Sequence, residues 1–243
     1  MLTFLVAAAA LAVLFVALIY VESRYKSDLV DAGTLIAPLA RLLRRPFETL
    51  DGYEQPELIE VIFQKTQAYH PEGDWPEMLG ASTVLDFGGG CGLHYKQAKV
   101  PGVRWAVVET PAMVERAKEL ATANLQFFSN ISDARQWLGD VDIMYSNGAL
   151  QYAMDPVIKL KQLCGVHAKK MLWYRVSLSA HSTEREIQSS RLSNNGPGKL
   201  HVEDKFVKYA RTKIPEHDFL VAHSDYALIE RGPDWFRFEL KSL

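Results

Sequence analysis

The chain has 243 residues, 48% of them hydrophobic, which is enough for one well-filled domain after a short non-globular segment is set aside. The 27 Lys and Arg residues nearly balance the 29 Asp and Glu residues, which argues against a nucleic-acid partner, because such proteins usually carry a basic excess. The two cysteines, Cys91 and Cys164, exclude a disulfide framework and a CxxC pair, and no histidine spacing resembles a ligand motif, so no metal is expected.

The first 22 residues are a candidate membrane anchor. From Leu2 to Val21 the chain is uncharged and almost wholly apolar, and about 20 such residues are what a helix needs to cross a bilayer. A buried core helix is rarely this long and uniform. A cleaved signal peptide would need a basic start and small residues before the cleavage point, which this run lacks. We therefore predict a transmembrane anchor at residues 1–22.

The cations near this run predict its orientation. They all follow it: Arg24, Lys26, Arg41, Arg44 and Arg45. The positive-inside rule then predicts a single-pass protein of the cytoplasmic membrane, with its globular domain facing the cytoplasm. Residues 23–50 also carry leucines at helical spacing, which fits either an interfacial helix on anionic lipid or a first helix packed on the domain. We treat 23–50 as a juxtamembrane amphipathic segment and 51–243 as the globular domain.

Helical and strand patterns alternate after residue 51. The apolar spacing predicts helices at 56–69 and 112–123, and strands at 83–87, 104–108, 125–128, 142–145 and 170–176. This alternation predicts an α/β fold with a mostly parallel sheet. The polar stretch 177–199 is rich in Ser, Asn and Gly, so it predicts a long loop or lid, and two final strands are expected at 219–229 and 235–240.

A glycine-rich turn follows the strand at 83–87, where the chain reads VLDFGGGCG. Glycines permit a sharp turn and let a ligand approach the backbone. The spacing of Gly88, Gly90 and Gly92 is G-x-G-x-G, not the G-x-G-x-x-G of dinucleotide sites, and no Gly-Lys-Ser/Thr follows. Asp86 would repel a pyrophosphate but attract a cationic amino acid group. These features favour S-adenosylmethionine, which carries an ammonium and a sulfonium but no phosphate.

A second carboxylate ends the next strand, in Val107-Val108-Glu109. An acidic residue about 20 positions beyond the glycine turn is placed to accept the hydroxyls of a nucleoside ribose. The alternative is a surface glutamate at a strand end, but the glycine turn makes that interpretation weaker.

These two motifs resemble those of class I S-adenosylmethionine-dependent methyltransferases, over about residues 83–176. The resemblance implies a Rossmann-like fold, with a mostly parallel seven-stranded sheet and helices on both faces, and makes 51–243 the methyltransferase domain. It also implies that Asp86, Gly88, Gly89 and Gly90 surround the methionine end of S-adenosylmethionine and that Glu109 holds the ribose. Thr110, Pro111 and Met113 would flank the adenine, and Asn130 stands where the family often has an Asp.

A narrower resemblance covers the ends of the fourth and fifth strands, where the chain reads YSNGALQYAMDP and WYR. With the earlier motifs, these runs are similar to a methyltransferase family encoded among bacterial surface-polysaccharide genes. The resemblance implies that Asn147, Leu150, Gln151 and Tyr152 lie near the cofactor and the transferring methyl. Leu150 and Tyr152 fit a packing role equally well.

Catalysis of methyl transfer depends mainly on positioning and desolvation, with a base for an alcohol acceptor. His94, His181 and His201 are candidate bases, and His201, Tyr152 and Arg175 form the predicted catalytic set. Arg175 would bind an anionic group of the acceptor, or else pair with a neighbouring carboxylate. The prediction is O- or N-methylation of a glycan, nucleotide-sugar or lipid-linked precursor at the membrane. The alternatives are an NAD-dependent oxidoreductase or epimerase on a similar fold, and a non-catalytic binding module.

Overall fold

The computed structural model describes residues 49–73, 75–202 and 205–242. The chain divides into two units, and the second begins at Thr49. The predicted anchor at 1–22, and the juxtamembrane segment as far as residue 48, lie outside the described residues. Among the helices that are described, none combines the length and the apolar character that crossing a membrane requires.

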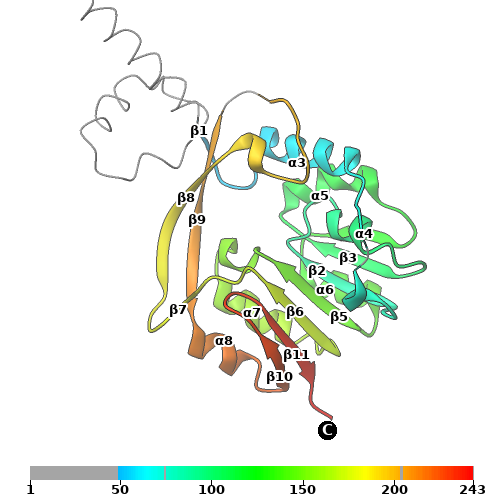
Figure 1. Ribbon diagram of the computed structural model, residues 1–243, viewed down its shortest axis with the longest axis vertical. Helices are drawn as coiled ribbons and strands as arrows, with labels where there is room; N and C mark the ends of the chain where they lie inside the picture. The colour runs from blue at the N-terminus through cyan, green and yellow to red at the C-terminus, as the bar shows by residue number, and fades with distance from the viewer. Residues whose placement is uncertain (1–48, 74, 203–204, 243) are drawn as a thin grey trace, which may run out of the picture. The chain divides into compact units, whose positions relative to one another are not determined.

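A seven-stranded sheet forms the centre of the second unit (Figure 1). In spatial order its strands are β10 (Tyr226–Arg231), β11 (Phe236–Leu240), β6 (Lys170–Tyr174), β5 (Ile143–Asn147), β2 (Thr83–Phe87), β3 (Arg104–Val108) and β4 (Leu125–Phe128). β11 runs antiparallel to both of its neighbours, and the pairs among the other five adjacent strands are parallel. The predicted mostly parallel Rossmann-like sheet is confirmed.

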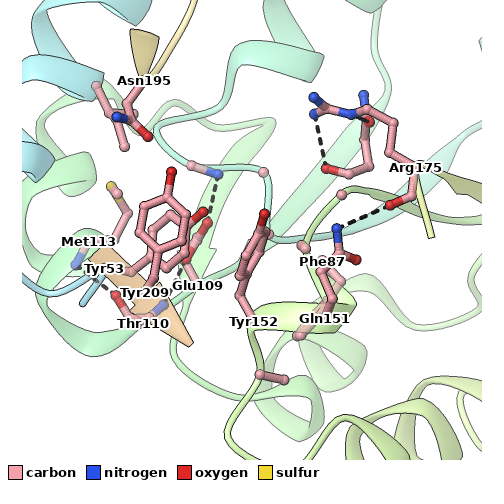
Figure 2. Close-up of a pocket in the computed structure, with 18 of the residues that line it drawn as sticks. Tyr53, Phe87, Glu109, Thr110, Met113, Gln151, Tyr152, Arg175, Asn195 and Tyr209 are labelled. Carbon is pink, nitrogen blue, oxygen red and sulfur yellow. Dashed lines mark hydrogen bonds between the residues drawn. The ribbon is translucent and has the colours of Figure 1, made fainter. Parts of the chain in front are cut away.

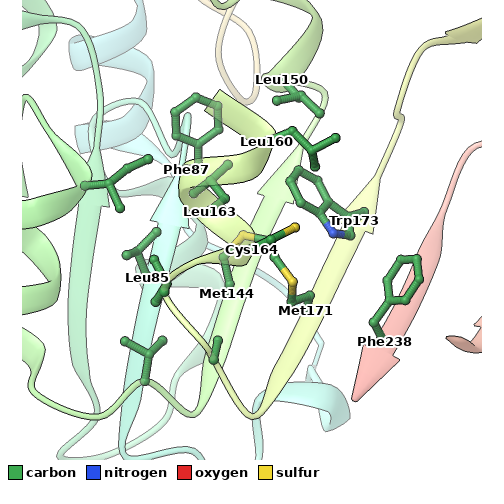
Figure 3. Packing of buried hydrophobic residues seen from close by; sticks show 14 of the residues in the cluster. Leu85, Phe87, Met144, Leu150, Leu160, Leu163, Cys164, Met171, Trp173 and Phe238 are labelled. Carbon is green, nitrogen blue, oxygen red and sulfur yellow. The ribbon is translucent and has the colours of Figure 1, made fainter. Parts of the chain in front are cut away.

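Helices cover both faces of this sheet, as predicted. Alternate residues of each strand point to opposite faces. Leu85 and Phe87 pack with one set of helices, α6 (Ile131–Leu138), α7 (Pro156–Cys164) and α8 (Glu216–Ala222), and part of this cluster is shown in Figure 3. Val84 packs on the opposite face with α3 (Pro56–Ala68), α4 (Leu93–Ala98) and α5 (Pro111–Ala117).

A second, smaller sheet stands beside the first (Figure 1). It consists of β1 (Thr49–Asp51), β7 (Leu178–Ser179), β8 (Glu184–Arg191) and β9 (Phe206–Pro215). β9 pairs in parallel with β1 and β7 and antiparallel with β8. Val207 and Tyr209 of β9 pack with Leu58 and Val61 of α3, so this sheet has its own small core.

The second sheet corrects the prediction of an irregular loop at 177–199. β8 has the polar sequence EREIQSSR and its residues are mostly exposed, so it lacks the alternation that predicts a half-buried strand. Its backbone is instead ordered by eight register pairs with β9, from Glu184–Lys213 to Arg191–Phe206.

Two element boundaries are also corrected. The predicted strand at 219–229 begins as helix α8, whose first turn carries Glu216 and Asp218, acidic residues that favour a helix N-terminus. β10 starts only at Tyr226. The predicted helix at 112–123 ends at Ala117 and is followed by a short 3₁₀ turn, Lys118–Leu120.

Candidate functional site

A cavity of about 900 Å³ opens at the carboxyl ends of β2, β3, β5 and β6. β2 lies between β3 and β5, so the strand order reverses here, and ligands of open α/β sheets bind at such a switch point. The second sheet and α3 supply the other walls, and Figure 2 shows side chains that line the cavity.

The glycine turn after β2 forms part of the cavity wall, and two of its residues have to be glycine. Gly88 has a φ of +77°, and a Cβ there would lie 2.0 Å from the Cβ of Ala149. A Cβ on Gly89 would lie 2.2 Å from the Asp86 carboxylate oxygen Oδ2. The turn therefore packs tightly on its protein side and leaves its other side to the cavity.

Asp86 does not line the cavity, although the sequence predicts it near the methionine end of S-adenosylmethionine. The residue is fully buried beneath the turn. Trp105 donates its indole Nε1–H to Asp86 Oδ2 at 3.0 Å, and His94 Nδ1 lies 3.0 Å from the same oxygen. Asp86 therefore supports the turn and orients His94.

Glu109 lies where the sequence predicts, at the end of β3 and in the cavity wall. Its Oε1 accepts a hydrogen bond from Gly90 N at 3.0 Å, and its Oε2 accepts one from Thr110 N at 3.0 Å. Burial raises the pKa of the Glu109 carboxyl, and these two N–H groups oppose that shift. Each oxygen retains a lone pair, so both can accept ligand hydroxyls.

An unpartnered hydroxyl on α3 also indicates a ligand. Thr66 lines the cavity and is fully buried, and its Oγ1 has no hydrogen-bond partner. Buried polar atoms are almost always hydrogen-bonded, so we expect a polar group of a bound ligand to be the partner of this hydroxyl. With the glycine turn and Glu109, it gives a surface that fits the amino acid and ribose parts of S-adenosylmethionine.

Most of the predicted site residues line this one cavity: Gly88, Gly89, Gly90, Glu109, Thr110, Met113, Asn147, Tyr152 and Arg175. Thr110 also caps α5, because its side chain accepts a hydrogen bond from Met113 N at 3.4 Å.

Besides Asp86, three predicted site residues do not line the cavity. Leu150 is buried in the core between the sheet and α7. Asn130 caps α6, since its Oδ1 accepts a hydrogen bond from Asp133 N at 2.8 Å, and Ser129 lines the cavity instead. His201 is exposed, whereas its neighbours Leu200 and Val202 pack against the core of the second sheet.

Among the three candidate bases, His94 lines the cavity, whereas His181 and His201 do not. His94 is nearly buried, and Tyr145 packs edge-on against its ring at a centroid distance of 4.9 Å. Because its Nδ1 faces Asp86, its Nε2 is the ring nitrogen left for a ligand. This Asp–His arrangement fixes the ring in the manner of a general base.

The cavity wall also holds a cluster of three tyrosines, of which the sequence predicted only Tyr152. Tyr53, from the loop after β1, stacks on Tyr209 of β9 at 4.5 Å between ring centroids, and Tyr152 lies 5.1 Å from Tyr53 (Figure 2). Tyr152 donates its hydroxyl hydrogen to Gln188 Oε1 of β8 at 2.6 Å. Burial raises the pKa of Tyr53 and Tyr152, so both phenols stay protonated. Tyr53 and Tyr209 come together because β1 pairs with β9 in the second sheet, and that sheet was not predicted from the sequence.

No family model and no curated protein matches this sequence. Solved structures that match this chain include the N-terminal domain of EvdMO1 in the presence of S-adenosylhomocysteine and D-fucose, at 13% identity and a TM-score of 0.40, over 77% of this chain and 84% of that one. The sugar N-methyltransferase KedS8 from Streptoalloteichus sp ATCC 53650 matches at 14% identity and a TM-score of 0.42, over 77% and 88%. The glycopeptide N-methyltransferase MtfA, complexed with S-adenosylmethionine, matches at 12% and 0.42, over 86% and 100%. Likenesses this weak do not define an activity, which has to follow from the cavity.

Proposed function

We propose that the chain is an S-adenosylmethionine-dependent methyltransferase. The observation that carries the proposal is the single cavity that holds the glycine turn, Glu109 and the unpartnered Thr66 hydroxyl at the switch point of the sheet. These groups match a nucleoside linked to an amino acid. S-adenosylmethionine supplies, when bound, a methyl group activated by its sulfonium.

The cavity residues then divide into two sets. Glu109 accepts the ribose hydroxyls, Thr66 bonds the amino acid end, and Met113 lines the adenine side. Tyr152 and Arg175 belong to the acceptor side. Together they would hold the two reactants in line, and positioning of this kind accounts for most of the catalysis that methyl transfer requires.

His94 is the base that this proposal uses for a hydroxyl acceptor. Its Nε2 takes the acceptor proton while the acceptor oxygen bonds to the methyl carbon and the carbon–sulfur bond breaks, which leaves S-adenosylhomocysteine. The Asp86 carboxylate, 3.0 Å from Nδ1, stabilises the imidazolium that forms.

For the acceptor, we propose a glycan, nucleotide-sugar or lipid-linked precursor methylated on oxygen or nitrogen. The apolar run from Leu2 to Val21 is the reason for placing the reaction at the cytoplasmic membrane, with the domain on the cytoplasmic side. The narrower resemblance to a methyltransferase family encoded among surface-polysaccharide genes supports the same choice.

Calorimetry on the purified full-length chain tests the cofactor. S-adenosylhomocysteine should bind and NAD should not. Glu109→Ala should weaken S-adenosylhomocysteine binding by about tenfold to a hundredfold, because hydrogen bonds to a charged group contribute about 1.5–3 kcal/mol and each 1.4 kcal/mol is tenfold in affinity.

Glu115→Ala is the matched control, because Glu115 lies on α5 with its side chain 76% exposed. It should leave the affinity unchanged. Tighter binding of NAD would favour the oxidoreductase alternative. Undiminished affinity in Glu109→Ala would refute the ribose site.

A further inference from the structure

A second unpartnered polar atom belongs to Gln151, which lines the cavity. Its Nε2 donates a hydrogen bond to the backbone carbonyl of Arg175 at 3.1 Å. Since a carbonyl can only accept, the amide nitrogen has to face Arg175, and Oε1 has to face away from it. Oε1 is buried and has no hydrogen-bond partner, the whole residue is only 6% exposed, and it lines the cavity. Oε1 therefore needs a donor from a ligand.

The backbone of Arg175, whose carbonyl oxygen holds the Gln151 amide, is strained. Arg175 has a φ of +51°, in the left-handed region that residues other than glycine seldom adopt. Strain of this kind tends to occur at binding sites. At Arg175 the carbonyl oxygen lies within hydrogen-bond distance of Gln151 Nε2. This hydrogen bond sets the direction in which Gln151 Oε1 points.

The side chain of Arg175 lies at the same end of the cavity and carries an uncompensated charge. Its Nε donates to Asn147 Oδ1 at 2.6 Å, which leaves further N–H groups of the guanidinium for a ligand. Gly148 makes room for it, because a Cβ at that position would lie 3.2 Å from Arg175 Nε. Within the described parts of the chain, no carboxylate forms an ion pair with Arg175.

Cationic side chains outnumber acidic ones in the cavity wall. Lys159 and Arg211 also line the cavity, and Arg211 pairs with Glu186 at 3.2 Å. No ion pair of Lys159 is found among residues 49–73, 75–202 and 205–242. The acidic residues in the cavity wall are Glu109, at the ribose position, and Asp234, which is exposed, as Arg175 is.

The tyrosine cluster of Tyr53, Tyr152 and Tyr209 lies next to this polar pair. Figure 2 shows Tyr152 between Gln151 and Arg175 on one side and Tyr53 and Tyr209 on the other. Ring faces and phenol hydroxyls together suit a cyclic, hydroxyl-bearing molecule, because they combine apolar area with hydrogen bonds.

We propose that the acceptor is an acidic sugar, in which a hydroxyl or amine stands beside a carboxylate or phosphate. Gln151 Oε1 accepts a hydrogen bond from a hydroxyl or amine of the sugar other than the hydroxyl whose proton His94 takes, and the Arg175 guanidinium binds the anionic group. This inference rests on the proposed methyltransferase function and adds the chemical class of its acceptor.

Saturation-transfer NMR on the full-length chain with bound S-adenosylhomocysteine tests the acceptor class. The probes are methyl glucuronide, glucose 1-phosphate and the neutral methyl glucoside, so that carboxylate and phosphate are distinguished. One or both acidic sugars should bind at least tenfold more tightly than methyl glucoside. Arg175→Met should remove this preference, and Arg175→Lys should restore part of it. Gln151→Met should weaken binding of the acidic and the neutral sugar alike.

Arg185→Met is the control, since Arg185 is an exposed residue of β8 outside the cavity wall. It should keep the wild-type preference. S-adenosylhomocysteine should still bind every variant, which separates a wrong acceptor class from a wrong cofactor and from misfolding. Equal binding of the three sugars, binding of none, or a preference that survives in Arg175→Met would overturn the proposal.

Discussion

At the scale of single residues, contact between Gly89 and Asp86 links the cavity wall to the buried network beneath it. Gly89→Ala places a methyl group 2.2 Å from Asp86 Oδ2, so the turn or the carboxylate has to move. Overpacking of this kind costs about 1–3 kcal/mol. We expect a lower melting temperature and S-adenosylhomocysteine affinity reduced at least tenfold, measured by thermal shift and calorimetry.

Gly165→Ala serves as the comparison for this change. Gly165 has an ordinary φ of −68° at the end of α7, and its added Cβ would meet Lys161 O at 3.3 Å, a much milder contact. Its cofactor affinity should match the wild type. A Gly89→Ala protein that binds as tightly as this control would show that the turn tolerates a side chain.

Residues whose role is set by adjacent sequence could be predicted, and those set by distant packing could not. Gly88 and Glu109 follow directly from strand ends, and the structure places both in the cavity. Asn130 and Leu150 stand at comparable strand ends, yet one caps a helix and the other packs in the core. Sequence spacing does not distinguish these outcomes, because a shift of one position along the chain decides whether a side chain faces the cavity, a helix end or the core.

At the scale of elements, the short 3₁₀ helix Leu192–Asn194 and the residues after it are fixed to α3 by a buried lysine. Lys65 is 3% exposed and donates from Nζ to the carbonyls of Ser193 and Asn195, both at 2.8 Å. Burial lowers its pKa. Asn194 and Asn195 line the cavity, so this lysine holds part of the wall in place.

We therefore expect Lys65→Met to loosen this wall while α3 stays folded. Backbone amides of residues 192–197 should exchange hydrogen faster in deuterium-exchange mass spectrometry, and S-adenosylhomocysteine should bind more weakly. Lys118→Met, which removes a lysine 59% exposed on a 3₁₀ turn, should change neither. Unaltered exchange at 192–197 in Lys65→Met would mean that the loop is held by its own hydrogen bonds.

The second sheet could not be predicted from the sequence. β9 shows partial alternation of buried and exposed residues, but β8 is polar throughout and acquires its strand form only by pairing with β9. Such pairing is a long-range property, because 14 residues separate the end of β8 at Arg191 from the start of β9 at Phe206. The strands β2 to β6 could be predicted because each carries its own apolar pattern.

At the scale of the whole molecule, His223 links α8 to strands β6 and β11 of the main sheet. Trp173 of β6 donates its Nε1–H to His223 Nε2 at 2.9 Å, and His223 Nδ1 donates to Phe219 O at 2.7 Å. Phe238 of β11 stacks on the ring at 4.0 Å. Both ring nitrogens are thus used by the neutral form, and burial lowers the pKa of His223 to about 4.

This histidine should make the stability of the fold sensitive to acid. Its pKa is depressed from 6.5 in the unfolded chain to about 4, so its contribution is complete above pH 6.5 and is lost as the pH falls toward 4. The loss amounts to about 3 kcal/mol of unfolding free energy, since one pKa unit corresponds to about 1.36 kcal/mol. Urea unfolding of the full-length chain at several pH values measures it.

His223→Phe should flatten this part of the pH profile, whereas His217→Gln, at an exposed position of α8, should leave it as in the wild type. A profile with the same slope between pH 6.5 and 4 in His223→Phe would assign the acid sensitivity to the carboxylates instead.

The acceptor side of the cavity is built from paired strands, and this has a thermodynamic consequence. β9 is bonded to β8 from Phe206 to Lys213 and to β7 at Ile214 and Pro215, so Tyr209 and its neighbours are already ordered before any ligand arrives. A preorganised wall spares the entropy of ordering a flexible segment. The heat-capacity change of acceptor binding should then match the apolar surface that the acceptor itself buries, with no added contribution from coupled folding.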